Sequence, residues 1–166
     1  KEETQDFINQ NINMDSGKYR LWKHQKIALL RAIYCFEVLN KKNILLNIVT
    51  GGGKTSIIGC LIAWMYSVYN IKKFLILVPN LIVRDRLQKD FVKGDVFRDF
   101  NFLSNDESRR LSLHLLQAGS NPQGMLESNI ILGNIQQLYQ AHISGQRNLS
   151  FLMKNIGDIM IFNDEA

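Results

Sequence analysis

Three consecutive glycines followed by lysine and threonine, in the segment Thr50–Thr55, constrain the fold of this chain more than any other feature. The short apolar run Ile44–Val49 precedes them, and a long apolar segment from Lys54 to about Tyr69 follows. A short apolar run that ends at glycines predicts a buried strand, and the longer segment predicts a helix. Glycines let the loop between them point backbone N–H groups inward, and the helix start adds positive partial charge. The sequence therefore predicts a strand–loop–helix unit that binds the phosphates of a nucleoside triphosphate, with ATP the expected nucleotide.

Each residue of this loop has an expected role. The backbone from Thr50 to Gly53 surrounds the phosphates, Lys54 reaches the β- and γ-phosphates, and the Thr55 hydroxyl binds Mg²⁺. The complete phosphate-loop pattern has an additional glycine where this chain has Ile48. The alternative is a glycine-rich hairpin turn that a lysine follows by chance.

The rest of the chain alternates between strand and helix patterns. A helix is expected at Lys23 to Leu39, with a buried face formed by Ile27, Leu30, Tyr34 and Val38. The remaining predicted elements are strands at Phe74–Val78, Leu111–Leu116, Ile130–Leu132 and Ile159–Phe162, helices at Leu81–Phe91 and Ile135–His142, and a solvated turn at Asn105–Arg110. This order predicts an α/β fold with a mostly parallel sheet and helices on both faces. In such a fold the chemistry lies at the carboxyl ends of the strands.

Two acidic residues, Asp164 and Glu165, end the last predicted strand. An aspartate at this place can hold Mg²⁺, since hard cations prefer oxygen ligands. A glutamate beside it can polarise an attacking water. The alternative is a helix start or a solvated loop.

Composition limits the partners and the compartment. The 166 residues fit one domain, and the net charge of +5 with a pI of about 9.3 weakly favours a polyanionic partner. No apolar stretch is long enough to span a bilayer, and Lys1–Asn13 is too polar for a signal peptide. A cytoplasmic protein is the expectation. The three histidines are too dispersed to predict a metal site.

The loop and the acidic pair together resemble motifs I and II of superfamily-two helicases and translocases, the DEAD/DEAH-box group. Within that group the likeness is to the helicase-like subunit of type I and type III restriction enzymes. The resemblance implies a RecA-like P-loop NTPase domain from residue 19 to residue 166, cut at motif II, with residues 1–18 as an N-terminal extension.

Further motifs of that group occur in the same order. Leu21–Gln25 resembles the adenine-recognition element, in which Gln25 would read the adenine edge. The resemblance assigns nucleic-acid contacts to Pro79, Asn80 and Arg84 in motif Ia and to Asn134 and Gln136 in motif Ib. Asn134 stands where the family usually has threonine.

The resemblance implies ATP hydrolysis coupled to translocation on nucleic acid or to its unwinding, with Lys54, Asp164 and Glu165 as catalytic residues. ATP and Mg²⁺ are the implied cofactors; DNA is the preferred partner and RNA stays open. A second RecA-like domain would supply an arginine finger, so this domain alone should bind nucleotide and hydrolyse it poorly. The alternatives are a P-loop kinase or non-helicase NTPase, and a nucleotide-gated nucleic-acid-binding scaffold.

Overall fold

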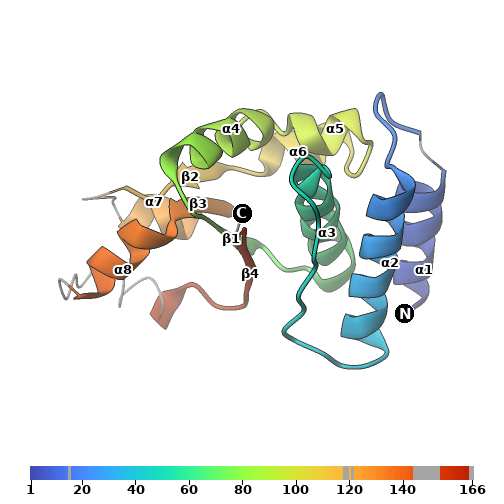
Figure 1. The fold of residues 1–166 in the computed structure, drawn as a ribbon, viewed down its shortest axis with the longest axis horizontal. Coiled ribbons are helices and arrows are strands. Elements are labelled where there is room, and N and C mark those ends of the chain that lie inside the picture. Colours follow the sequence, from blue (N-terminus) through green and yellow to red (C-terminus); the bar gives the residue numbers. More distant parts are fainter. Residues whose placement is uncertain (15, 118–119, 121, 144–153, 165–166) are drawn as a thin grey trace. The chain divides into compact units, whose positions relative to one another are not determined.

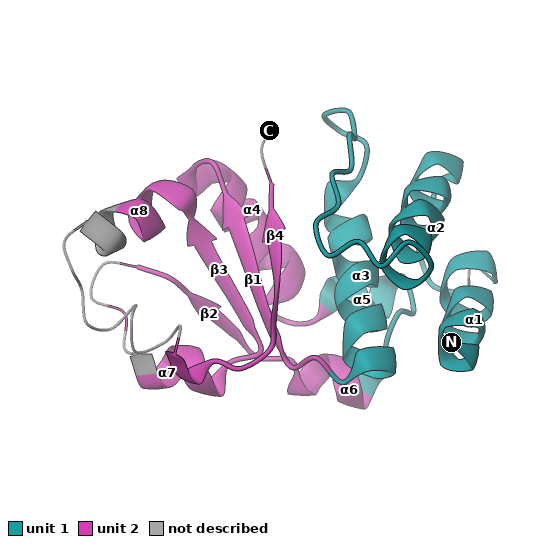
Figure 2. Cartoon of the chain, turned by 90° about the horizontal axis from the view of Figure 1, so that it is seen from below, with its two compact units in different colours: residues 1–70, 95–105 teal, residues 71–94, 106–166 magenta. Residues whose placement is uncertain are grey.

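The computed structural model describes residues 1–14, 16–117, 120, 122–143 and 154–164. It divides the chain into two compact units (Figure 2). Unit 1 contains residues 1–70 and 95–105, and unit 2 contains residues 71–94 and 106–166.

Unit 1 is helical among its described residues (Figure 1). Its elements are α1 (Glu2–Phe7), the π-helix η1 (Ile8–Asn13), α2 (Lys23–Glu37), α3 (Lys54–Tyr69) and α5 (Asp95–Asp99). The predicted helix after the glycines is confirmed as α3, which is buried at every position from Ser56 to Met65. Trp64 of α3 stacks edge-on against Phe36 and donates a hydrogen bond from its indole N–H to Thr4, at 3.2 Å. The N-terminal segment thus packs on the helix that follows the glycines.

The predicted buried face of α2 is wrong. Ile27, Leu30, Tyr34 and Val38 are between 38% and 63% exposed. The residues that α2 buries are Gln25, Leu29, Ala32 and Ile33. Both sets have helical spacing, and the helix buries the set that includes the polar Gln25. Burial of this glutamine is possible because it finds several hydrogen-bond partners there.

Unit 2 contains a parallel sheet. Its elements are β1 (Lys73–Val78), α4 (Leu81–Phe91), β2 (Leu113–Leu115), α7 (Pro122–Glu127), β3 (Ile130–Asn134), α8 (Ile135–Ile143) and β4 (Ile159–Asn163). The strand order is β2-β3-β1-β4, and every pairing among the described strands is parallel. Helix α4 lies on one side of these strands and α8 on the other (Figure 1). The predicted α/β architecture is therefore confirmed.

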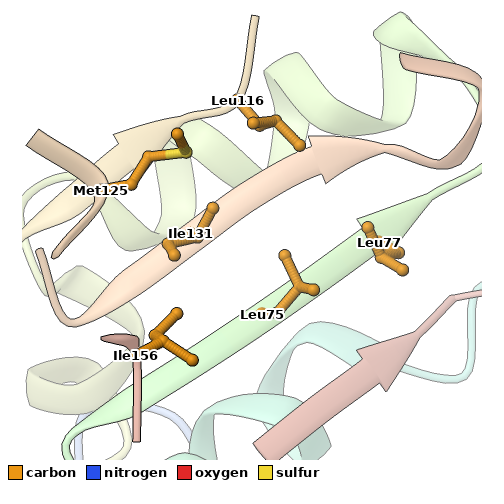
Figure 3. Packing of buried hydrophobic residues seen from close by; sticks show 6 residues of the cluster. All are labelled: Leu75, Leu77, Leu116, Met125, Ile131 and Ile156. Carbon is orange, nitrogen blue, oxygen red and sulfur yellow. The ribbon is translucent and has the colours of Figure 1, made fainter. Parts of the chain in front are cut away.

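The two central strands form the core of unit 2. Leu75, Leu77 and Ile131 point to one face, where Leu116, Met125 and Ile156 cover them (Figure 3). Side chains alternate along a strand, so Phe74, Ile76 and Val78 of β1 face the opposite side, and all three are buried. Both faces of β1 are apolar because both are covered.

The predicted strand at Ile44–Val49 is absent: the structure has no regular element there. Leu45 is 93% exposed and Val49 is 75% exposed. A strand is stabilised by hydrogen bonds to a neighbouring strand, and no strand in the described part of the chain pairs with this segment. The apolar run Ile44–Val49 has the side chains of a buried strand, but no neighbouring strand in the described part of the chain pairs with it.

The predicted turn at Asn105–Arg110 is also wrong, because these residues form the helix α6. Asp106 and Glu107 lie in its first turn, and Arg109 and Arg110 lie in its last. Acidic residues at the start and basic residues at the end stabilise a helix through its dipole. The order of the charges was the signal for a helix.

Candidate functional site

The glycine loop is a tight turn that leads directly into α3. The Gly52 N–H donates to the Val49 carbonyl at 2.9 Å, and Gly51 in the third position of this turn has φ of 80°. Gly53 has φ of 73° and is the N-cap of α3. Both angles lie in the left-handed region, which side chains other than glycine rarely adopt. The loop therefore needs glycine at both positions for its backbone geometry.

The three glycines differ in what surrounds them. A Cβ atom on Gly52 would lie 2.8 Å from Cγ2 of Ile48 and 2.9 Å from the Val49 carbonyl oxygen. A Cβ atom on Gly53 would lie 2.0 Å from Nε2 of Gln25, whereas one on Gly51 would meet nothing within 4 Å. Gly52 and Gly53 are thus required by close packing, and Gly51 faces open space.

Gln25 holds this loop from α2. Its Oε1 accepts from the Trp22 backbone N–H at 2.7 Å. Its Nε2 lies 3.3 Å from the Gly52 carbonyl oxygen, 3.2 Å from that of Gly53 and 2.9 Å from Oγ of Ser56. The residue is only 4% exposed. In this conformation the amide of Gln25 braces the phosphate loop, and the contact with adenine stays a prediction that requires this amide to turn away.

His24 is a second brace that the sequence did not single out. Its Nε2 lies 2.9 Å from the Gly52 carbonyl oxygen. A carbonyl oxygen only accepts, so Nε2 must carry the proton in this contact. Ser56 is a third: it donates from Oγ to the Gly53 carbonyl at 2.8 Å. The proximity of His24 to Gln25 in the sequence was the one available signal.

Replacing Gln25 with alanine should lower the free energy of unfolding by about 1 to 3 kcal/mol, because buried groups of the loop and of Trp22 lose their partner. Chemical denaturation measures this. Gln5 is the matched control: it is an exposed glutamine whose amide bonds only to Asn9. Its replacement with alanine should change the stability by less than about 0.5 kcal/mol. Equal effects at the two positions would contradict the bracing role.

The start of α3 suits an anion. Its N-cap, Gly53, has no side chain and therefore cannot cap the helix as serine or aspartate does. Lys54 and Thr55 stand in that turn and are partly exposed. The N–H groups and the positive end of the helix are the elements with which proteins bind phosphate. A helix start of this kind can bind a phosphate group, and the Thr55 hydroxyl is an oxygen ligand of the kind that Mg²⁺ prefers.

In unit 2 the sequence-predicted polar residues gather at the carboxyl ends of three neighbouring strands. Val78 of β1 is in register with Asn134 of β3, and Leu77 is in register with Asn163 of β4. The Asp164 N–H donates to the Leu77 carbonyl at 2.8 Å, which extends the pairing past the end of β4. The structure thus places Asp164 at the same sheet edge as the two motifs that were expected to contact nucleic acid. Glu165 lies outside the described residues.

Motif Ia forms the turn from β1 into α4. Asn80 is the N-cap of α4 and its Oδ1 accepts from the Val83 N–H at 3.0 Å. Arg84, one turn further, is bound to Asp85 through both Nε and Nη2, at 3.1 and 2.9 Å. The sequence prediction missed Asp85 as the partner of this arginine. To contact a phosphate, the Arg84 guanidinium must either leave the exposed Asp85 carboxylate or bind the carboxylate and the phosphate together.

Motif Ib forms the step from β3 into α8. Asn134 is 4% exposed. Its Oδ1 accepts from the Gln136 N–H at 2.7 Å, and its Nδ2 donates to the Pro79 carbonyl at 3.3 Å. The amide expected to donate to a phosphate is therefore engaged inside the protein, whereas Gln136 itself is exposed.

The two halves of the expected ATP site lie in different units. Lys54, Thr55 and Gln25 belong to unit 1, and Asp164 belongs to unit 2. A threonine hydroxyl and an aspartate carboxylate are hard oxygen donors, so both fit Mg²⁺ chemically. Their joint action on one ion stays a prediction.

Comparisons with known proteins identify the fold. Two crystal structures of the UvsW helicase from Bacteriophage T4 match the chain with TM-scores of 0.57 and 0.54, at 15% and 14% sequence identity. The matches cover 96% and 98% of this chain, but only 59% and 34% of the solved chains. At this level of identity they show the fold alone, and they confirm the predicted α/β RecA-like fold. No curated protein matches the sequence.

Two further observations concern membrane crossing and the family of the chain. Among the described residues, no helix combines the length and the apolar character that crossing a membrane requires. The family model "Type III restriction enzyme, res subunit" matches residues 18–166, which include the whole region in which the motifs were found. The chain therefore belongs to the family of the res subunit of type III restriction enzymes.

Proposed function

We propose that this chain is the ATP-binding motor domain of a nucleic-acid translocase or helicase that acts on DNA. The observation that carries the proposal is the glycine loop: two glycines with left-handed φ, hydrogen-bonded to Gln25, lead directly into the start of α3. Such a loop binds the phosphates of a nucleotide through backbone N–H groups. Lys54 would add its positive charge to the β- and γ-phosphates.

Hydrolysis would need both units. Thr55 and Asp164 would hold Mg²⁺, which would neutralise negative charge on the phosphates. Glu165 would accept a proton from the attacking water. The remaining element is an arginine from a second RecA-like domain, so the described chain alone should bind nucleotide and turn it over slowly.

Nucleic acid would bind along the strand ends of unit 2. The turn from β1 into α4 and the step from β3 into α8 lie side by side there, since Val78 and Asn134 are in register. Both are helix starts, and Arg84 and Gln136 stand within the first turns. Contacts of this kind go to phosphates, so binding should not depend on base sequence.

The test is the affinity for a fluorescent DNA duplex of variants Arg84→Ala and Gln136→Ala. Both should bind DNA more weakly and bind an ATP analogue with unchanged affinity. Loss of Arg84 removes one charged phosphate contact, so the slope of log affinity against log salt should fall by about 1. Gln136 carries no charge, so its loss should leave that slope unchanged.

Lys89→Ala is the matched control. Lys89 is exposed and lies in the last turn of α4, away from the strand ends. The variant loses the same unit of charge as Arg84→Ala. If both variants weaken DNA binding equally, net charge and not a defined surface is responsible, and the proposed nucleic-acid site is wrong.

A further inference from the structure

The side chain of Asn134 connects two segments of unit 2 that the sequence separates. Its Nδ2 donates to the carbonyl of Pro79, in the turn before α4, at 3.3 Å. Its Oδ1 accepts from the N–H of Gln136, in the first turn of α8, at 2.7 Å. One buried amide thus holds the entry to α4 and caps α8 at the same time.

In this conformation burial and two hydrogen bonds keep the Asn134 amide from a phosphate on the surface. Asn134 is 4% exposed, whereas Asn80 and Gln136 beside it are exposed. A phosphate on the surface can reach the exposed pair, but not the Asn134 amide without displacing one of its two partners. Breaking a buried hydrogen bond without replacement costs about 1 to 3 kcal/mol.

We propose that Asn134 is a positioning residue, which fixes the starts of α4 and α8 relative to each other so that both contact one DNA backbone together. This inference rests on the proposed function, because it presumes that the two helix starts bind phosphates. The hydrogen bonds between Pro79 and the first turn of α4 support this inference. Asn80 caps α4 by accepting from the Val83 N–H, and the Arg84 N–H donates to the Asn80 carbonyl at 3.2 Å. A shift of the Pro79 carbonyl is therefore passed to Arg84.

Asparagine suits this place because its amide offers a donor and an acceptor on one rigid plane. Threonine offers a hydroxyl where asparagine has Cγ. That oxygen can still accept from Gln136, but it stands one bond short of the Nδ2 that reaches Pro79. Asn134→Thr therefore keeps the cap of α8 and removes the bridge to Pro79, and Asn134→Ala removes both.

The experiment measures the affinity of the full chain for a fluorescent DNA duplex at several salt concentrations. We expect Asn134→Thr to weaken binding by about tenfold, the loss that one hydrogen bond of ordinary strength represents. The affinity for an ATP analogue should stay close to that of the unchanged chain, and the melting temperature should fall by a few degrees, because the Pro79 carbonyl loses its partner. If Asn134→Thr binds DNA like the unchanged chain, the positioning role is overturned.

A double-mutant cycle with Arg84→Ala separates positioning from direct contact. If Asn134 acts through α4, the double variant should lose less affinity than the product of the two single losses, since part of each loss is the same Arg84 contact. Losses that multiply would mean that Asn134 contacts DNA independently, and would overturn the inference while the proposed function stands. If Arg84→Ala and Gln136→Ala also leave DNA binding unchanged, the proposed function fails and the inference fails with it.

A role in stability alone predicts another result. In that case Asn134→Ala would lower the melting temperature, and DNA affinity measured well below that temperature would not change. That outcome would overturn the positioning role even though the hydrogen bonds exist. Only the coupling between Asn134 and Arg84, measured well below the melting temperature of the threonine variant, supports it.

Discussion

Replacing Lys54 with alanine should abolish most of the affinity for ATP. The lysine is the first residue of α3, directly after the left-handed Gly53, and it is the only side chain of the loop with a positive charge. A hydrogen bond to a charged group contributes about 1.5 to 3 kcal/mol, so affinity should fall by about 10- to 150-fold. Titration with a fluorescent ATP analogue in the presence of Mg²⁺ measures the loss.

Two controls define what the loss means. Lys42→Ala removes the same charge from an exposed position before the loop, and affinity should stay within about twofold. Lys54→Arg keeps the charge but replaces a compact ammonium by a planar fork, so it should restore only part of the affinity. If Lys54→Ala binds the analogue as tightly as the unchanged chain, the loop does not hold phosphate and the proposed function is wrong.

Local patterns predicted the elements that depend on local interactions. Helix α3 begins at Lys54 and ends at Tyr69, as the apolar run after the glycines indicated. β1 and β3 were predictable because each is a short apolar run that is buried on both faces. Their parallel pairing followed from the alternation of strands and helices.

The wrong predictions concern segments whose structure depends on distant parts of the chain, which a local sequence pattern does not show. The run Ile44–Val49 has the composition of a buried strand, but strand formation depends on a paired neighbour. Helix α2 has two faces with helical spacing, and hydrophobicity alone favoured the one that is exposed. The buried face includes Gln25, whose amide bonds to the carbonyls of Gly52 and Gly53. These residues lie about 28 positions further along the chain, outside any local pattern.

The candidate site shows the same division. The sequence predicted which residues stand at the loop and at the strand ends, because motif order and strand boundaries are visible in it. It did not predict that the amides of Gln25 and Asn134 would be engaged within the protein. Both are polar residues in motifs associated with ligands, and only the structure shows that each is buried against backbone carbonyls. A motif indicates where a ligand binds more reliably than which side chain touches it.

Replacing Gly53 with alanine should damage the loop far more than replacing Gly51. Both residues have φ in the left-handed region, at 73° and 80°, and an alanine there costs about 1 to 2 kcal/mol. At Gly53 the new Cβ would also lie 2.0 Å from Nε2 of Gln25, whereas at Gly51 it meets nothing within 4 Å. Displacing a packed group adds about 1 to 3 kcal/mol, so Gly53→Ala should lower the free energy of unfolding by about 2 to 5 kcal/mol in total. Chemical denaturation of the two variants measures the difference.

Gln25→Ala in the same chain tests whether the collision is the cause. With the Gln25 amide removed, the added cost of Gly53→Ala should disappear, and the substitution should then cost no more than Gly51→Ala. The double variant would thus be more stable than the sum of the single losses predicts, a coupling expected only for residues in contact. If the two losses add, the close approach of Gln25 to Gly53 does not exist in solution. The bracing of the phosphate loop by α2 would then have to be abandoned, even if Lys54 still binds ATP.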